Sequence, residues 1–189
     1  PAENDTINVI SKDIDFIYLG GDQKIKGFSD IVDFCQKMSE IKSFRIAVLG
    51  ELSTDSKRRL LEITNSSKIC IDIMLFGFLK NTTDLIRRSK VLLLPITAPH
   101  FCRPAIEAGF EHIPFLIRRH DSISDFAIEG YNCEMYDDLE EMIDKSVLFL
   151  ENDNYIKELG SNNYKISTDF IYDGNIGDSF LKAVEDILK

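Results

Sequence analysis

The chain has 189 residues, a length that fits one large domain or two small ones. Hydrophobic residues make up 44% and charged residues 29%, which excludes a largely disordered chain. The formal charge of −10 argues against sequence-independent binding to nucleic acid, because such binding needs clustered basic residues. No apolar run reaches the roughly 18–20 residues of a membrane span, so we expect no membrane-spanning segment.

The four cysteines, Cys35, Cys70, Cys102 and Cys133, show no CxxC spacing and lie mostly in apolar stretches. We therefore expect free, buried thiols in a protein of the reducing cytoplasm. The three histidines are scattered along the chain and form no paired Cys/His spacing, so the sequence predicts no metal site.

Short apolar runs rich in β-branched residues alternate with longer amphipathic stretches along the chain. The short runs predict strands at residues 14–19, 44–49, 69–75, 91–95, 114–117 and 133–136. Apolar residues at steps of three and four predict helices at residues 28–41, 55–65, 83–88, 103–111, 122–129, 138–151, 153–166 and 176–188. Ser29 is the expected N-cap of the first helix, since its hydroxyl can accept an orphan N–H bond.

This alternation predicts an α/β fold, with a doubly wound, Rossmann-like parallel sheet and helices on both faces. One domain of this kind accounts for the whole chain, residues 1–189, with residues 138–189 forming its C-terminal helices. Open sheets of this class bind ligands at the carboxyl ends of their strands. The loops that follow the strands are therefore the places to search for a site.

The loop after the first strand, residues 20–27, contains Gly20, Gly21, Lys24 and Lys26. Glycines let backbone N–H groups approach a ligand closely. The lysines and the start of the next helix add positive charge, which suits a phosphate or diphosphate. The pattern is neither GxGxxG nor a Walker A loop, so a Gly-rich turn with two solvated lysines is the alternative.

A second candidate segment, residues 95–109, leaves a buried strand and enters a helix. Pro104 suits a first helical turn, where free N–H groups could hold an anion. The Glu107 carboxylate, one turn further on, could accept two hydroxyl bonds from a ribose diol; the alternative is a solvated or salt-bridged glutamate. His100 is a candidate general base or sugar contact, with an exposed loop histidine as the alternative.

Two further histidines have simpler interpretations. His112 follows the helix and would stabilise its C-terminus through the helix dipole. His120 stands beside Arg118 and Arg119 and would belong to a basic surface cluster. The sequence contains no GxSxG pattern and no evident Cys–His dyad, so nothing in it indicates nucleophilic catalysis.

Several sequence blocks stand in a recognisable order and spacing, at residues 18–27, 75–95, 101–117 and 128–132. The third block resembles the signature FGxxxxEAxAxGxPVI of GT-B glycosyltransferases, and the last resembles their "v.dG.nG" block. The first block, together with residues 46–50, resembles the start of the nucleotide-sugar-binding domain of these enzymes, and the second block matches the one that follows it. Together the blocks are similar to the C-terminal half of a family-4-type retaining glycosyltransferase.

This resemblance implies roles for the charged and glycine positions. Lys26 would neutralise the donor diphosphate, and Lys24 would add charge beside it. Gly20 and Gly21 would let the loop approach the donor or acceptor. Glu107 would bind the ribose.

The resemblance also assigns backbone contacts to the donor. Groups near Phe78 and Leu79 would hold the base, and those of Phe101, Cys102 and Arg103 would touch the sugar and phosphate. Such enzymes stabilise the leaving diphosphate with basic groups and helix dipoles, so no metal and no cofactor is expected.

Three positions depart from the family pattern. Pro99 stands where the E-x7-E motif has its first Glu, and Gly21 stands where the family usually has an Arg. Cys102 replaces the usual Gly and could crowd the backbone approach to the sugar. His100 and Lys24 could compensate in part for the first two changes.

The function implied is transfer of a sugar from a nucleotide-diphosphate sugar to an acceptor glycan or lipid, as in polysaccharide biosynthesis. We expect a hexosyltransferase-like reaction with retention and without metal. The alternative is a non-catalytic GT-B-like scaffold or regulatory module of a glycosylation complex. A flavodoxin-like or receiver domain is a third option, and Gly20-Gly21 in place of acidic residues argues against a receiver.

The chain begins at Pro1 without an initiator Met, and we expect it to be a piece of a longer protein. An N-terminal acceptor-binding domain would lie outside this chain, which alone would bind the donor and transfer nothing. The apolar stripe of residues 176–188 would pack on its own domain or cross to that partner domain. We expect a cytoplasmic protein, with membrane association open for the longer form.

Overall fold

A parallel sheet of six strands lies at the centre of the computed structural model, which describes residues 11–98, 102–120 and 126–172. The strands are the apolar runs of the sequence, namely β1 (Ile14–Leu19), β2 (Phe44–Leu49), β3 (Ile71–Phe76), β4 (Ser89–Leu94), β5 (Phe115–Arg118) and β6 (Cys133–Tyr136). Their order is β3-β2-β1-β4-β5-β6, and every neighbouring pair is parallel. This order confirms the predicted doubly wound, Rossmann-like fold.

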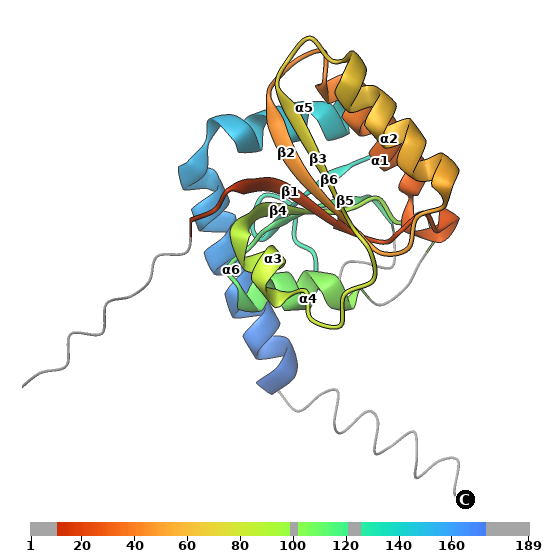
Figure 1. The fold of residues 1–189 in the computed structure, drawn as a ribbon. Helices are drawn as coiled ribbons and strands as arrows, with labels where there is room; N and C mark the ends of the chain where they lie inside the picture. Colours follow the sequence, from red (N-terminus) through yellow and green to blue (C-terminus); the bar gives the residue numbers. More distant parts are fainter. Residues whose placement is uncertain (1–10, 99–101, 121–125, 173–189) are drawn as a thin grey trace, which may run out of the picture.

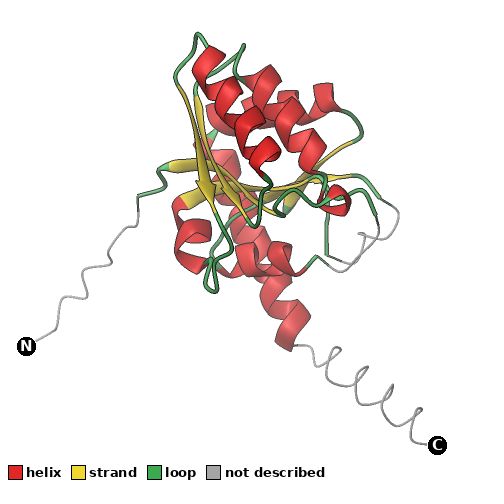
Figure 2. Ribbon diagram, turned by 45° about the vertical axis from the view of Figure 1, so that its right-hand side comes forward, coloured by secondary structure: helices red, strands yellow, loops and turns green. Residues whose placement is uncertain are grey.

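Helices cover both faces of the sheet (Figures 1 and 2). One layer contains α1 (Phe28–Met38), α2 (Thr54–Ser66) and α5 (Leu139–Glu151). The other contains α3 (Thr83–Arg88), α4 (Arg103–Phe110) and most of α6 (Asp153–Tyr172). α6 passes from one layer to the other, because Ile156 packs with the first cluster of buried side chains and Ile166 with the second.

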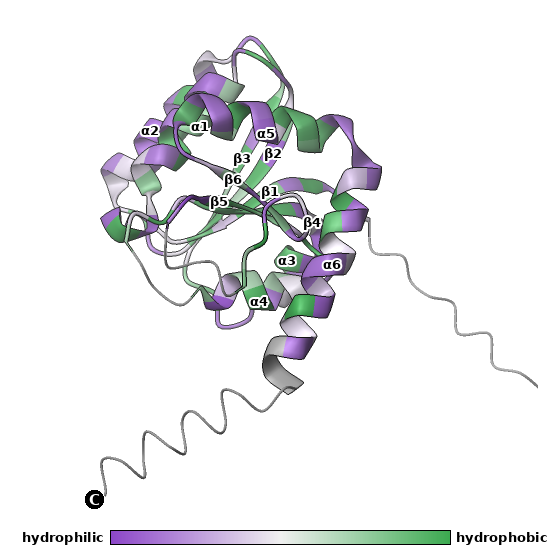
Figure 3. Cartoon of the chain, turned by 180° about the vertical axis from the view of Figure 1, so that it is seen from behind, coloured by the Kyte–Doolittle hydropathy of each residue, from purple (hydrophilic) through white to green (hydrophobic). Residues whose placement is uncertain are grey.

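The strands are apolar on both faces because both are covered, as expected for a parallel sheet. Figure 3 shows mostly hydrophobic strands between helices that carry polar residues on their outer sides. On the α1 side, Phe16, Phe34 and Phe44 form an edge-to-face cluster with ring centroids 5.4–6.3 Å apart. This cluster fixes α1 against β1 and β2, and so fixes the loop that leads into α1.

The N-cap predicted for the first helix is wrong. α1 begins after Gly27, which has a φ of 73°, and no side chain caps it. Ser29 lies inside the helix, with its hydroxyl 3.5 Å from the Asp30 carboxylate. A positive φ at the entrance of the helix is a glycine conformation, so Gly27 takes the position that a capping serine would fill.

The helix that begins at Asp153 continues beyond its predicted end to Tyr172. Its weak helix formers are used for packing. A Cβ at Gly160 would lie 2.1 Å from the His112 carbonyl oxygen, so only glycine permits this approach. The amide of Asn163 donates to the Ile113 carbonyl at 2.7 Å.

Two other predicted helices have different outcomes. The helix predicted at 122–129 is wrong for residues 126–129, which form a turn and a bridge between Glu129 and Cys133. Residues 122–125 lie outside the described residues. The predicted helix at 176–188 also lies outside them. None of the helices in the described part of the chain has the length and apolar character needed to cross a bilayer.

The cysteines are free, as predicted, but they are not all buried. Cys35, Cys102 and Cys133 lie in the core, whereas Cys70 is exposed. Cys70 comes immediately before β3, where the chain enters the sheet from solvent.

Candidate functional site

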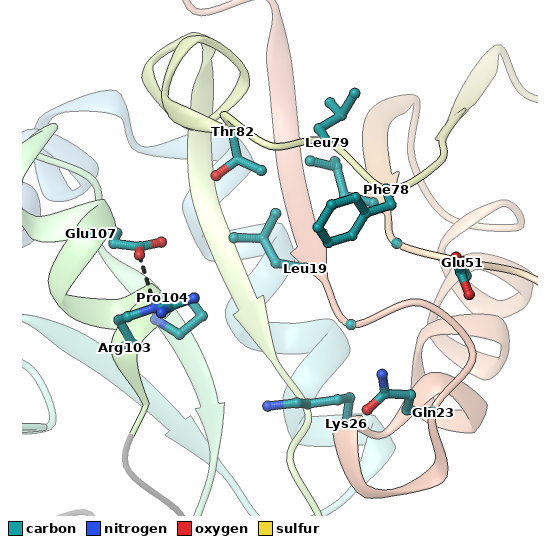
Figure 4. Close-up of a pocket in the computed structure, with 13 residues that line it drawn as sticks. Leu19, Gln23, Lys26, Glu51, Phe78, Leu79, Thr82, Arg103, Pro104 and Glu107 are labelled. Atoms are coloured by element: carbon teal, nitrogen blue, oxygen red, sulfur yellow. Dashed lines mark ion pairs between the residues drawn. The ribbon is translucent and has the colours of Figure 1, made fainter.

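A cavity of about 480 Å³ opens at the carboxyl ends of the strands. It lies where the strand order reverses between β1 and β4, the position at which open α/β sheets bind their ligands. Four segments form its walls: the β1–α1 loop, the loops after β2 and β3, and the first turns of α4 (Figure 4). The lining residues are Leu19, Gly20, Gln23, Lys26, Leu49, Gly50, Glu51, Phe78, Leu79, Thr82, Arg103, Pro104 and Glu107.

The β1–α1 loop depends on glycine at its two turns. Gly21 has a φ of 57°, and a Cβ there would lie 2.5 Å from the Glu51 carbonyl oxygen. A Cβ at Gly27 would lie 1.7 Å from the Pro95 carbonyl oxygen. Both neighbours are backbone atoms and cannot rotate away, so the loop keeps this path only with glycine at both positions.

Hydrogen bonds join this loop to the segment after β2. The Gly21 N–H donates to the Leu49 carbonyl at 2.8 Å, and the Asp22 N–H donates to the Glu51 carbonyl at 3.0 Å. The Asp22 carboxylate accepts from the Ser53 N–H at 2.7 Å and from the Ser56 hydroxyl at 2.9 Å. These bonds hold the pKa of Asp22 below its usual range, so the carboxylate stays charged at the start of α2.

Lys26 comes from the 3₁₀ turn Lys24–Lys26 and lines the cavity. Figure 4 shows its side chain extending toward the first turn of α4. Lys24 does not line the cavity, although the sequence pointed to both lysines. Successive residues of a 3₁₀ turn are about 120° apart, so two residues separated by one other point in different directions. Gln23 occupies the wall instead.

The opposite wall is the start of α4, where Pro104 stands in the first turn as the sequence predicts. Arg103 and Glu107 form an ion pair of 3.0 Å across one helical turn, with 80% and 42% of their side chains exposed. An exposed i,i+4 pair contributes only about 0.3–0.5 kcal/mol, so a ligand can replace Arg103 as the partner of Glu107 at small cost.

Cys102 precedes α4 and is buried beneath this wall rather than exposed in the cavity. Burial raises the pKa of its thiol to about 11, against the opposing effect of the Lys26 charge. The thiol is therefore protonated at neutral pH and behaves as a small core side chain.

The third wall is apolar. Phe78 follows β3 and is 75% exposed, and Leu79 beside it also lines the cavity. Figure 4 places the Phe78 ring between the Leu19 side and the Glu51 side of the cavity. An exposed aromatic ring at the rim of a polar cavity offers a flat surface on which a planar group can stack.

Six of the predicted donor-site residues line this cavity, namely Gly20, Lys26, Phe78, Leu79, Arg103 and Glu107. Gly21, Lys24 and Cys102 do not line it. His100 and Phe101, together with Pro99, lie outside the described residues. Gln23, Glu51 and Thr82 line the cavity but were not identified from the sequence, because no local pattern marks a single polar side chain in a loop.

The basic cluster predicted around His120 is wrong. The Arg118 guanidinium pairs with Asp30 at 2.5 Å, and Arg119 pairs with Glu129 at 3.0 Å. The His120 ring nitrogen lies 2.6 Å from the Ile96 carbonyl oxygen. These pairs come from elements that are distant in the sequence, so the local pattern could not reveal them.

His112 directly follows the C-cap of α4 and has a φ of 55°. Its ring stacks on Tyr164 of α6, with centroids 4.2 Å apart. His112 therefore helps to join α4 to α6, away from the cavity walls.

Comparison with protein families gives one match, to the model described as glycosyl transferases group 1, over residues 2–166. A search of curated protein sequences gave no significant match.

Solved structures with this fold share little sequence with the chain. Anabaena HepE, in complex with UDP and glucose, has a TM-score of 0.78 at 14% identity, with 93% of this chain and 49% of that one covered. S. aureus TarM, in a complex that includes UDP, has a TM-score of 0.76 at 16% identity, with 92% and 36% covered. The C-terminal domain of LpcC, a group 1 glycosyl transferase from Francisella tularensis, has a TM-score of 0.70 at 18% identity, with 89% and 93% covered. The chain thus spans between a third and a half of the HepE and TarM chains.

Proposed function

The chain belongs to the glycosyl transferases group 1 family, and from that premise we propose that it is the donor-binding domain of a glycosyltransferase. The donor is a nucleotide-diphosphate sugar. The reaction transfers the sugar to an acceptor glycan or lipid with retention, in the manner of the family-4-type enzymes that the sequence resembles.

One observation carries this proposal: Lys26 and Glu107 lie on opposite walls of a single cavity, with Phe78 on a third (Figure 4). A nucleoside diphosphate presents a base, a diol and an anion in that order. Phe78 supplies an apolar surface, Glu107 supplies an acceptor for hydroxyl groups, and Lys26 supplies a positive charge. This chemical match supports donor binding at the carboxyl edge.

The proposed roles follow from these positions. Glu107 accepts from the ribose hydroxyls in place of Arg103, and backbone groups at Phe78 and Leu79 hold the base. Lys26 stabilises the charge that develops on the leaving diphosphate, and the first turn of α4 adds the positive end of its dipole. With these groups the proposal needs no metal and no cofactor, and His100 remains the candidate for a catalytic contact.

The acceptor, in this proposal, binds to an N-terminal domain that lies outside the chain. HepE and TarM are each at least twice as long as the region that matches, which supports a second domain in the complete protein. The chain alone is then expected to bind the donor and transfer nothing. We keep the reducing cytoplasm as the proposed location, in view of the four free cysteines.

A second candidate function is a non-catalytic module that keeps the fold without the reaction. The observation that favours it is Gly21, which stands where the family usually has an Arg. A Cβ at this position would meet the Glu51 carbonyl oxygen at 2.5 Å, so the present backbone excludes an arginine there. One positive charge that the family places near the diphosphate is thereby missing.

Titration calorimetry with UDP-, GDP- and ADP-sugars tests the first proposal. We expect one donor class to bind with a stoichiometry of about one. Absence of binding by every member of the panel would contradict donor binding. Binding without turnover by the complete protein, with any acceptor tested, would favour the non-catalytic module.

A further inference from the structure

Tyr18 is a buried tyrosine directly behind the loop that carries Lys26. It is only 2% exposed and belongs to β1, one residue before the loop turns away from the sheet. Its hydroxyl lies 3.0 Å from the Gly21 carbonyl oxygen and 3.2 Å from the Lys26 carbonyl oxygen. A single phenol thus reaches both ends of the loop from below.

The loop is folded closely around this phenol. A Cβ at Gly20 would lie 2.2 Å from the Tyr18 hydroxyl oxygen and 2.8 Å from the Lys26 Cβ. Only glycine fits at position 20, because any side chain there would collide with both the Tyr18 hydroxyl and the Lys26 side chain. Since Tyr18 does not line the 480 Å³ cavity at the carboxyl edge, it cannot act on a ligand there directly.

Thr97 contacts the loop near its Lys26 end, where its hydroxyl lies 3.4 Å from the carbonyl oxygens of Lys24 and Ile25. The Thr97 N–H donates to the Ile25 carbonyl at 3.1 Å, whereas Asp22 and its partners hold the opposite end. The Tyr18 hydroxyl bridges the two ends. Loss of this hydroxyl would remove the bond between β1 and the Lys26 carbonyl.

We propose that Tyr18 is a positioning residue for the donor diphosphate: its hydroxyl fixes the backbone of Lys26, so that the lysine side chain is held in the cavity before the ligand arrives. This inference rests on the proposed function. A charge that is already in place does not have to be ordered on binding, and preorganised groups therefore bind an anion more tightly.

The protonation of the phenol agrees with a permanent donor. Burial raises the pKa of Tyr18 well above its ordinary value, and the negative charges of Asp22 and Asp30 raise it further. The hydroxyl therefore keeps its proton throughout the pH range in which the protein would bind a nucleotide. It can donate to either carbonyl at any time.

Tyr18→Phe removes the hydroxyl and keeps the ring in the core, and Tyr136→Phe is the matched control. Tyr136 is equally buried on β6, where its ring lies 5.7 Å from the Arg118 guanidinium carbon. Two measurements are made on each variant: amide hydrogen exchange without ligand, and affinity for UDP, GDP and ADP by calorimetry. Lys26→Met is then added to each variant.

We expect Tyr18→Phe to raise amide exchange at residues 20–27 and leave α5 unchanged. We also expect it to weaken binding of the preferred nucleoside diphosphate about fivefold, the size of one ordinary hydrogen bond. In the Lys26→Met background this loss should disappear, which a purely structural role would not produce. Tyr136→Phe should change neither quantity.

Two results would overturn the inference while leaving the proposed function intact: unchanged loop exchange in Tyr18→Phe, or an affinity loss that persists in full without the Lys26 amine. Failure of the unmodified protein to bind any of the three nucleotides would instead contradict the proposed function and this inference together. Amide exchange is measured without ligand, so it shows whether the Tyr18 hydroxyl orders the loop independently of whether any nucleotide binds. It therefore distinguishes the failure of this inference from the failure of the proposed function.

Discussion

The two edges of the sheet are both hollowed, but they hold their charged side chains differently. The cavity at the carboxyl edge has a volume of about 480 Å³, and the hollow at the amino edge is larger, about 640 Å³. The amino-edge hollow is lined by Lys12, Asp13, Asp15, Ser43, Phe44, Arg45, Cys70, Ile71 and Asp72. Volume alone would therefore favour the amino edge.

The charges at the amino edge serve the fold. Asp13 accepts two bonds from Arg88, at 2.6 and 2.8 Å. Asp15 pairs with Lys90 at 3.1 Å and accepts from the Arg45 N–H at 2.9 Å. These carboxylates join neighbouring strands and the helix α3, and their bonding capacity is largely used within the protein.

At the carboxyl edge the arrangement is different. Glycines bring backbone close to the cavity, and the Arg103–Glu107 pair is exposed and easily replaced. The chemistry of the walls, rather than the size of the hollow, therefore identifies the better candidate site.

The glycines of the β1–α1 loop, at the carboxyl edge, should tolerate substitution least. Gly27→Ala adds a Cβ 1.7 Å from the Pro95 carbonyl oxygen at a φ of 73°. Left-handed strain and overpacking together should lower the free energy of unfolding by about 3 kcal/mol, measured by urea denaturation.

Two other glycines separate the causes of that loss. Gly130 has a φ of 71° with open space around a Cβ, so Gly130→Ala should cost about 1 kcal/mol through strain alone. Gly77 has open space and no positive φ, so Gly77→Ala should change stability by less than about 0.5 kcal/mol. Equal stability of the Gly27 and Gly77 variants would contradict the described loop.

Lys26→Met should weaken binding of the preferred nucleoside diphosphate roughly 10- to 100-fold, because it removes a charge-assisted bond to the diphosphate. Lys90→Met is the control at the amino edge, where the lysine pairs with Asp15. Calorimetry should show no change in affinity for that variant. An equal loss of nucleotide affinity in both variants would contradict the proposal that the ligand binds at the carboxyl edge.

Glu107→Gln should weaken binding about fivefold to tenfold, since the neutral amide accepts weaker bonds from the ribose than the carboxylate does. The variant should also lose the preference for the nucleoside diphosphate that binds over its 2′,3′-dideoxy analogue in competition titrations. Glu62→Gln is the matched control, because Arg58 and Glu62 form the same i,i+4 pair at 3.0 Å on α2. Retention of the full ribose preference in Glu107→Gln would remove the proposed role of this carboxylate.

Alkylation of the cysteines should distinguish the two edges of the sheet and should leave the affinity for nucleotide unchanged. Cys70 is exposed at the amino-edge hollow, whereas burial raises the pKa of Cys102 to about 11 under the carboxyl-edge cavity. Iodoacetamide at about pH 8 should therefore modify Cys70 first, because the other three thiols are buried and protonated. Peptide mass spectrometry should show the same Cys70 rate with and without nucleotide; protection by nucleotide would place the ligand at the wrong edge.

The strands were predictable because their signal is local. Continuous apolar runs such as Val91–Leu94 are buried on both faces, and such runs identify parallel strands without knowledge of their neighbours. The helix at Asp153 continues six residues past its predicted end at residue 166, through the weak helix formers Ser167, Thr168 and Asp169. Ser167 is buried against Gly109 of α4, and this tertiary packing outweighs the local preference.

The site was predictable only in outline. The rule that ligands bind at carboxyl ends of strands pointed to Lys26 and Glu107, and the structure brings both to one cavity. The direction of Lys24 depends on the 3₁₀ turn, and the presence of Gln23 and Glu51 depends on how two loops meet. Such long-range geometry leaves no mark in a local pattern of residues.

The most direct test of the central claim is to map which backbone amide signals shift in an NMR titration with the nucleoside diphosphate that binds. We expect shifts at residues 20–27, 50–51, 78–82 and 103–107, around the carboxyl-edge cavity. Shifts confined to residues 12–15, 43–45 and 70–72 would place the ligand at the amino edge and contradict it.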